Sequence, residues 1–551
     1  MPKLSLSTRA LRQATAVALG ASAVLGGVAA LPATALAKHN QISMIEDFND
    51  IYDPAGTLAQ FRALGANTVR VLVEWNTVAP DPNATKKPSF NATDSGAYPA
   101  AGWAPYDQIV RTAQQDGLTV DFTVTGGAPR WAEASAAPRA NGVNPQSVSW
   151  RPNAFDYGQF VQALGQRYSG HFTPSGQSSP LPRVHFWAIY NEPNFGQDLG
   201  PQAVNGSRTP TAPTMYRNLV RAGWNGLHRS GHGRDTILIG ELAAEGSWPH
   251  KPWRAAPQGL PGNYGQTRPL LFIRDLYCVN AAFQPLRGYA ARSIGCPTNV
   301  RGTRLFRRQN PALFSASGFA DHPYDGAASP TSRAGLKPDY ATFPVIGTLA
   351  ATLDHVNHVY GSRTRFAIYN TEYGEITNPP RKGKGYPSPA RAAVFMNQAE
   401  YISWKSGRLA SYMQYLLEDP PANTGAYTGF ASGLEFSNGK PKATYAAYQM
   451  PVWMPHTSFS HNANQEIWGS ARPAPFMKRD GHGNQFLAIQ INGRTIRRQR
   501  VNDGYFDTHM KFPRGHYTVR LAYTFPTSDS FLSVSELGKT IYSRSFRINV
   551  H

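Results

Sequence analysis

Two glutamates stand where a carboxylate can do chemistry. Glu192 follows the apolar-aromatic segment 185–190, and Glu372 follows the apolar segment 366–369 with the same plan of strand, polar residue, glutamate and turn. Either glutamate alone is more typical of a surface charge or of a neighbour to a helix cap. Together they form the pair that retaining glycoside hydrolysis requires, in which one carboxylate attacks the anomeric carbon and the other protonates the leaving oxygen.

Such a pair needs a scaffold that brings distant strand ends together, and the alternation of strand and helix patterns predicts one. Eight segments have strand patterns: 41–45, 67–75, 118–124, 185–190, 236–240, 318–324, 366–369 and 409–415. Helical spacing lies between most of them, at 54–64, 106–116, 155–168, 215–229, 344–360 and 390–406. Eight strands alternating with helices predict an α/β fold, a (β/α)8 TIM barrel over 38–454, whose active site lies at the carboxyl ends of the strands.

After the predicted barrel, apolar residues recur at every second position, which is typical of half-buried strands. The pattern runs through 487–491, 517–523 and 546–550. Asn492-Gly493 marks a turn between two such strands. We therefore expect a C-terminal all-β sandwich over 455–551, which either binds carbohydrate or packs against the barrel. Its aromatic residues alternate along strands without forming an exposed cluster, and this favours packing.

The first 37 residues have the pattern of a signal peptide, with a basic start, a short apolar run and a small-residue site at Ala35-Leu36-Ala37. A membrane anchor is the alternative. Residues 1–37 therefore predict a secreted, extracellular protein. The chain carries a net charge of +20, so it either attracts an anionic polysaccharide or cell-wall polymer, with cell-wall association, or uses the charge only for solubility. Nucleic acid is disfavoured because no recognition motif accompanies the charge.

The chain has two cysteines, Cys278 and Cys296, 18 positions apart in a Pro/Gly/Arg-rich insertion. Export favours a local disulfide between them, and two free buried thiols are the alternative. Because no histidine neighbours them, they do not indicate a metal site. We expect neither a metal nor an organic cofactor.

The motifs around the two glutamates resemble a known group of enzymes. Asn191-Glu192-Pro193 after the fourth strand and Thr371-Glu372-Tyr373-Gly374 after the seventh are similar to clan A glycoside hydrolases, especially families 39 and 5, and the likeness covers residues 41 to about 450. It implies retaining cleavage of O-glycosidic bonds in a polysaccharide or oligosaccharide, with Glu192 as general acid/base and Glu372 as nucleophile. The alternative is a non-catalytic carbohydrate-binding or wall-associated protein on a degenerate barrel.

Four further positions match the plan of the clan. The resemblance implies that Arg70 holds the nucleophile, where a cation would keep Glu372 ionised by lowering its pKa. It also implies that Asn191 bonds the sugar 2-hydroxyl, that Tyr324 bonds the nucleophile and that His322 bonds the substrate. A structural ion pair for Arg70 and a satisfied core histidine are the alternatives.

The sugar-binding aromatic residues and the nucleophile have competing interpretations. Trp75 and Trp131 lie at or beyond strand ends, where they either stack on sugar rings or pack in the core. Glu375 is a rival nucleophile three residues after Glu372, which matches the motif better. The chain lacks the histidine that many family 5 members carry after the third strand and the tryptophan usual after the eighth. Both departures fit family 39 better and leave the sugar and its linkage open.

Overall fold

The computed structural model describes residues 41–138, 148–203, 209–246, 264–382, 385–421, 430–479, 486–501, 504–529 and 531–551. These residues belong to one unit, Ala37–His551. The predicted signal peptide, 1–37, lies outside the described residues. Over the described part of the chain, no helix combines the length and apolar character needed to cross a membrane.

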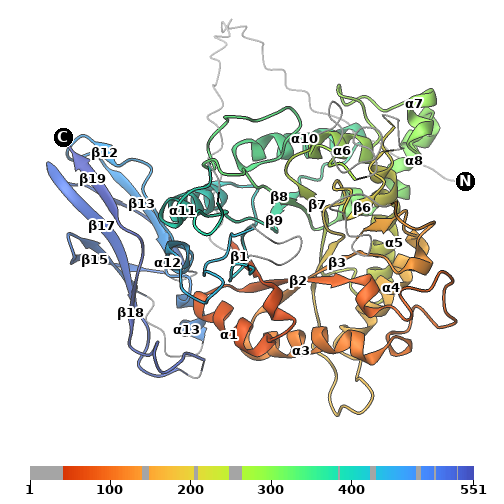
Figure 1. The fold of residues 1–551 in the computed structure, drawn as a ribbon. Coiled ribbons are helices and arrows are strands. Elements are labelled where there is room, and N and C mark those ends of the chain that lie inside the picture. The colour runs from red at the N-terminus through yellow and green to blue at the C-terminus, as the bar shows by residue number, and fades with distance from the viewer. Residues whose placement is uncertain are drawn as a thin grey trace, which may run out of the picture. The chain divides into compact units, whose positions relative to one another are not determined.

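Eight parallel strands form the barrel that the sequence predicts, in the order β10-β1-β2-β3-β5-β7-β8-β9 (Figure 1). Their bounds are β1 Ile42–Glu46, β2 Thr68–Glu74, β3 Thr119–Thr125, β5 Phe186–Ile189, β7 Thr236–Ala243, β8 Gly318–His322, β9 Ala367–Asn370 and β10 Ser411–Tyr415. A bridge between Ile368 and Leu409 joins the two ends of the sheet and closes it. The predicted fold class is therefore confirmed.

Helices follow most barrel strands, and some of them begin and end at recognisable capping signals. They are α1 Pro54–Leu64, α2 Trp75–Val78, α3 Ala100–Asp116, α4 Ala154–Arg167, α5 Ala212–Arg229, α10 Ile346–Val359, α11 Pro389–Lys405 and α12 Ala443–Gln449. The Asp53 side chain accepts a hydrogen bond from the Gly56 amide at the start of α1, and Gly65 ends that helix at φ 84°. Glycine adopts this left-handed conformation without the steric cost of a Cβ. Two short strands, β4 Ser149–Trp150 and β6 Leu199–Gly200, pair beside the barrel.

The insertion between β7 and β8, for which the sequence predicts no regular structure, contains four short helices. They are α6 Pro269–Leu276, α7 Gly288–Ser293, α8 Val300–Gln309 and α9 Ala312–Ser315. Leu270, Ile273 and Leu276 of α6 are buried on the barrel side of the insertion. The segments are too short for sequence periodicity to identify, and their tertiary packing supplies the stability that isolated short helices lack.

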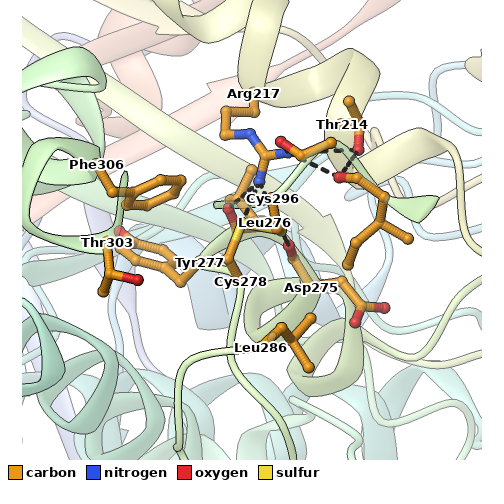
Figure 2. Close-up of a disulfide and its surroundings, with 12 residues drawn as sticks. Thr214, Arg217, Asp275, Leu276, Tyr277, Cys278, Leu286, Cys296, Thr303 and Phe306 are labelled. Carbon is orange, nitrogen blue, oxygen red and sulfur yellow. Dashed lines mark hydrogen bonds between the residues drawn. A yellow bond between two sulfur atoms is a disulfide. The ribbon is translucent and has the colours of Figure 1, made fainter. Parts of the chain in front are cut away.

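The expected disulfide joins Cys278 and Cys296 within this insertion, with 5.6 Å between the two Cα atoms. Arg217 of α5 lies against it (Figure 2). Its Nη1 donates to the Leu276 carbonyl oxygen and to Cys278 Sγ, both at 2.9 Å. The disulfide thus closes a loop within the insertion, and Arg217 attaches that loop to the barrel helix α5.

The barrel interior changes from apolar to charged toward the carboxyl ends of the strands. Phe186, Ala188, Leu238 and Ala320 form a small inner core. Alternate residues on the same strands face outward and join the main core with the helices. The charged side chains of the mouth lie beyond this inner core.

The C-terminal strands form two further sheets, as the alternating pattern predicts. One contains β11 Val452–Trp453, β13 Gln465–Ser470 and β16 Tyr505–Met510. The other contains β12 Ser458–Phe459, β19 Phe546–Val550, β17 Gly515–Thr524, β14 Phe486–Ile491, β15 Arg494–Arg500 and β18 Thr540–Tyr542. A short helix, α13, spans Ala474–Arg479. Asn492 and Gly493 have φ values of 49° and 78° in the turn between β14 and β15. Arg472 pairs with Glu400 of α11, with both carboxylate oxygens 2.7 Å from its Nη2. This region therefore packs on the barrel.

Candidate active site

Glu192 and Glu372 meet at the mouth of the barrel, after β5 and β9 respectively. One carboxylate oxygen of each and a ring nitrogen of His322 all lie within 4.8 Å of one another. The two glutamate side chains are 17% and 14% exposed, so both reach solvent. Glu192 has a φ of 37°, an uncommon conformation for a residue with a Cβ and one that often occurs at functional sites.

Arg70 of β2 lies beneath this pair and is fully buried. Its Nη1 contacts Glu46 and donates to Glu372 Oε2 at 3.2 Å. Its Nη2 donates to Asn191 Oδ1 at 2.6 Å and to Glu241 Oε2 at 2.8 Å. A buried guanidinium with several carboxylate partners fits the requirement that an interior charge be paired.

His322, at the end of β8, has both ring nitrogens against glutamates. Nδ1 lies 2.9 Å from Glu192 Oε1 and 3.4 Å from Glu372 Oε2, and Nε2 lies 3.0 Å from Glu241 Oε2. The Tyr324 hydroxyl donates to Glu372 Oε1 at 3.0 Å. Tyr324 therefore contacts the residue that the resemblance implies, whereas the nitrogens of His322 face protein carboxylates instead of an open cleft.

The charges of these groups depend on each other. Burial raises the pKa of Glu372, and His322 and Arg70 offset only part of the rise. Arg70 lowers the pKa of Glu372, as expected from the sequence, but burial outweighs the cations and the net direction is a rise. Burial alone would lower the pKa of His322, but Glu372, Glu192 and Glu241 raise it well above its usual value. Glu241 behaves differently, because Arg70 and His322 overcome its burial and lower its pKa.

These ligand-type atoms are also close enough to surround a cation. Glu192, His322 and Glu372 form such a group. However, a histidine must be neutral to bind a metal, and the pKa of His322 is raised by the neighbouring carboxylates. The arrangement therefore favours a hydrogen-bonded charge cluster over a metal site.

Sequence reasoning missed three acidic residues of the site. Glu46 ends β1, and burial raises its pKa to about 7. Glu241 follows Gly240 in β7, at the point where the predicted strand stops. Asp198 accepts a hydrogen bond from Asn191 Nδ2 at 3.2 Å, and burial raises its pKa well above the usual value. The strand-end rule that identifies Glu192 would also have found Glu46 and Glu241.

Trp75 and Trp131 have the placement of core residues. Trp75 is 1% exposed, packs edge-on against Trp131 and stacks on Phe160. Trp131 is 8% exposed, and its Nε1 donates to the Pro80 carbonyl oxygen. These contacts correspond to the core-packing alternative and leave neither ring an open face for a sugar.

Glu375, the rival nucleophile, is hydrogen-bonded to a tyrosine and not to a member of the charge cluster. Its side chain is buried, and its Oε1 accepts a hydrogen bond from the Tyr373 hydroxyl at 2.7 Å. Burial, together with the charge of Asp325, raises the pKa of Glu375 well above its usual value. Glu372, and not Glu375, therefore belongs to the cluster at the barrel mouth.

A cavity of about 660 Å³ adjoins the cluster on the side of β1 and β2. Glu46 and Arg70 form part of its wall. The carboxylates among its lining residues are those of Glu46, Asp47, Asp50, Glu74, Glu418 and Asp419, whereas Arg70 is the one arginine or lysine among them. The cavity is large enough for a sugar residue, and most of its charged lining residues are acidic.

Comparisons with known proteins give similarities of fold at low sequence identity. No protein-family model and no curated protein matches the sequence. A glucosidase from Croceicoccus marinus is 13% identical with a TM-score of 0.45, over 93% of this chain and 92% of that one. A family 39 glycoside hydrolase from Bacteroides cellulosilyticus is 12% identical with a TM-score of 0.41, over 93% and 81%.

A β-glucuronidase from Bacteroides uniformis is 8% identical with a TM-score of 0.37, over 93% of this chain. The match spans only 46% of the length of that enzyme. Because these TM-scores are below 0.5, the chemistry of the site has to follow from its own residues.

Proposed function

We propose that this protein is a retaining glycoside hydrolase that cleaves O-glycosidic bonds in a polysaccharide or oligosaccharide. The distance between the two carboxylates carries the proposal. Oxygens of Glu192 and Glu372 lie within 4.8 Å, whereas carboxyl groups are about 5–5.5 Å apart in retaining enzymes and roughly 6.5–9.5 Å apart in inverting ones. This short gap fits the retaining range better than the inverting one, which leaves space for a water between the two groups.

In the first step, an oxygen of Glu372 attacks the anomeric carbon while the bond from that carbon to the leaving oxygen breaks. The leaving oxygen takes the proton of Glu192, and the sugar remains as an ester on Glu372. In the second step, Glu192 takes a proton from water, whose oxygen attacks the anomeric carbon and releases Glu372. Arg70 and Tyr324 each hold one oxygen of Glu372 during both steps.

Hydrogen bonds at both ends of its amide fix Asn191 in position to contact the sugar. Its Oδ1 accepts from Arg70, and its Nδ2 donates to Asp198. A fixed amide next to the acid/base can strengthen its bond to the sugar 2-hydroxyl as the transition state forms. The acidic cavity beside the pair favours a neutral or amine-bearing sugar over a carboxylate-bearing one, because like charges disfavour each other.

Glutamine variants test the two roles. Glu192→Gln should lower turnover of unactivated substrates about 10²–10⁴-fold through loss of general acid/base catalysis, and azide should restore activity on an aryl glycoside with a good leaving group. Glu372→Gln should abolish turnover, and azide should not restore the product that it restores in Glu192→Gln. NMR of the first product should show retained anomeric configuration.

Glu375→Gln is the matched control on the same loop. Glutamine has the shape of the protonated side chain and still accepts from Tyr373, so activity should remain close to that of the unmodified protein. Normal turnover by either Glu192→Gln or Glu372→Gln would refute the proposal. Carbohydrate binding without hydrolysis of any substrate would support the non-catalytic binder instead.

The disulfide supports the further proposal that the protein acts outside the cell. Disulfides persist in oxidising compartments and are rare in the cytosol, and Cys278 and Cys296 are joined in the structure. N-terminal sequencing of protein from the culture medium should give a chain that begins after Ala37. A chain that stays in the cytosol with its first 37 residues would contradict this.

A further inference from the structure

Glu241 joins the two cations of the site through a single oxygen. Its side chain is fully buried, and Oε2 accepts from Arg70 Nη2 at 2.8 Å and from His322 Nε2 at 3.0 Å. Arg70 and His322 are the two cations that contact Glu372. Glu241 therefore influences the nucleophile through both of its cationic neighbours while it touches neither the nucleophile nor the cavity wall.

The backbone of β7 is bent so that Glu241 faces inward. Leu238 belongs to the inner core of the barrel, so regular alternation would direct residue 241 outward. The register with β8 shifts between Ile239 and Leu242, and Glu241 has a φ of 51°. Such a bulge re-aims a side chain and is common next to active sites. The Glu241 carbonyl oxygen also accepts the Glu192 amide at 2.9 Å, which connects the bulge to the turn that carries Glu192.

Gly240 makes this bend possible. A Cβ at position 240 would lie 2.4 Å from the Ala320 carbonyl oxygen of β8, and its φ is 111°. Both facts require glycine there. The strained residue at position 241 is therefore held by a close approach of the neighbouring strand, and strain of this kind persists only where the surrounding structure maintains it.

The contacts of His322 determine where protons lie around Glu192. Because Nε2 faces the Glu241 carboxylate, it carries a hydrogen and donates. Nδ1 then faces Glu192 Oε1 and Glu372 Oε2, and a hydrogen on Nδ1 satisfies both. When Glu192 Oε1 accepts this bond, the transferable proton of Glu192 belongs on its other oxygen, Oε2.

We propose that Glu241 is a positioning residue that holds His322 as an imidazolium, so that Glu192 keeps its transferable proton on Oε2 and Glu372 faces a fixed pair of cations. Its effect on catalysis rests on the function proposed above. Glu241 touches no substrate atom in this scheme. It acts through His322 and Arg70, much as a buried carboxylate orients the histidine of a catalytic triad.

The charge of His322 depends on groups from several elements. Those that act on it are Glu192 after β5, Glu241 on β7, Glu372 after β9, Asp321 on its own strand, and Glu46 and Asp198 at the mouth. Arg70, the other cation, opposes protonation of His322. Because carboxylates raise the pKa of His322, removal of the Glu241 charge lowers that pKa. His322 then loses its proton at a lower pH than in the unmodified protein.

Glu241→Gln and Glu46→Gln form a matched pair for the test. Both remove a buried carboxylate that contacts Arg70, but only Glu241 contacts His322. We expect Glu241→Gln to lower kcat about 10–100-fold, the usual effect of losing a partner behind a reacting group, with a small change in KM. Its alkaline limb of kcat against pH should move to lower pH. Glu46→Gln removes a charge that acts on His322 without a hydrogen bond to it, and should move that limb less. Glu241→Asp keeps the charge and should retain the limb while losing part of kcat through its shorter reach.

The ring nitrogens of His322 give a readout that does not depend on activity. In protein labelled with ¹⁵N-histidine, the signals lost in His322→Gln identify this ring, and its titration should occur at lower pH in Glu241→Gln than in the unmodified protein. An unchanged titration together with an unchanged pH profile would overturn the inference. Circular dichroism and a thermal melt show whether each variant is folded, and a folded variant with normal kcat also counts against it.

The two proposals fail in different ways. If the unmodified protein hydrolyses no glycoside but the His322 titration shifts as expected, the proposed function is wrong and the charge link from Glu241 to His322 stands. If the protein is active and Glu241→Gln loses only thermal stability, with both pH measurements unchanged, the positioning role is wrong and the function stands.

Discussion

Cations at the barrel mouth are buried and paired with carboxylates, whereas those at the edge of the C-terminal sheet are exposed. At the mouth, Arg70 and His322 are fully buried, and each contacts two or more carboxylates. At the edge strand β15, Arg494–Arg500 has the sequence RTIRRQR, with six of its seven residues exposed. A buried charge needs partners and changes their protonation, whereas an exposed one is screened by water and salt.

In this basic protein, the buried and paired charges, not the exposed ones, are those expected to affect function. The chain has a net charge of +20, yet carboxylates outnumber cations in the lining of the cavity beside the site. Cations on an exposed edge strand such as β15 generally disfavour edge-to-edge pairing with other sheets. Substitutions at the mouth should therefore alter catalysis and stability, and substitutions on β15 should alter little except association.

Among the tests of this comparison, the largest effect is expected from removal of the central cation. Arg70→Gln leaves Glu46, Glu241 and Glu372 without their shared partner, so kcat should fall roughly 10²–10³-fold. The free energy of unfolding should fall by about 3–5 kcal/mol, as for other broken buried ion pairs. Steady-state kinetics and urea unfolding measure both. Arg70→Lys keeps one charge but cannot make the paired contacts, and full activity in that variant would show that charge alone suffices.

His322→Gln should give a loss of stability that depends on pH. The folded-state pKa of His322 is raised above its unfolded value of about 6.5, so its contribution is fully present below that pH and disappears as pH rises through the folded pKa. At pH 6 the loss should be on the order of 2 kcal/mol, the scale of hydrogen bonds to charged groups. Urea unfolding from pH 5.5 to 9 measures it, and a loss that grows with pH would contradict the raised pKa.

The charge of the substrate should matter at the acidic cavity. Among aryl glycosides that differ only in one substituent, the hydroxyl and ammonium forms should exceed the carboxylate form in kcat/KM by about tenfold at low salt. The difference should shrink at 0.5 M salt because screening weakens exposed charges first. A preference for the uronide at both salt concentrations would show that the cavity does not receive the charged group.

The smallest effect is expected on β15. Arg497→Gln with Arg498→Gln should change the free energy of unfolding by no more than about 0.5 kcal/mol and leave kcat/KM unchanged. The corresponding pair of valine substitutions should instead increase self-association, because it leaves an exposed, uncharged edge. Light scattering separates the two pairs. A large loss of activity in the glutamine pair would contradict the expectation that the exposed charges of β15 do not affect catalysis.

The two glutamates after β5 and β9 could be predicted because their signal is local. Each follows an apolar strand, and the carboxyl end of a barrel strand faces the mouth. Glu241 also directly follows its predicted strand, 236–240, but regular alternation from Leu238 would direct its side chain outward. The continuation of β7 to Ala243 depends on the close approach of β8 at Ala320, which no local pattern contains.

The aromatic residues show a second limit of sequence reasoning. Trp75 and Trp131 stand at strand ends, and their type suits either a sugar platform or the core. Whether each ring packs in the core or faces the cleft depends on its tertiary neighbours; Trp75, for example, stacks on Phe160. The pKa of Glu372 is a similar case, since its direction depends on how burial compares with the nearby cations.

The sequence by itself determined the eight-strand order, the alternating C-terminal strands, the Asn492-Gly493 turn and the positions of Glu192 and Glu372. These features follow from the period of apolar residues and from backbone preferences, which act over a few neighbouring residues. Only the tertiary structure decided that Glu241 faces inward, that His322 lies among three carboxylates, and which pKa values rise. Those outcomes depend on distance and burial among residues that barrel closure brings together.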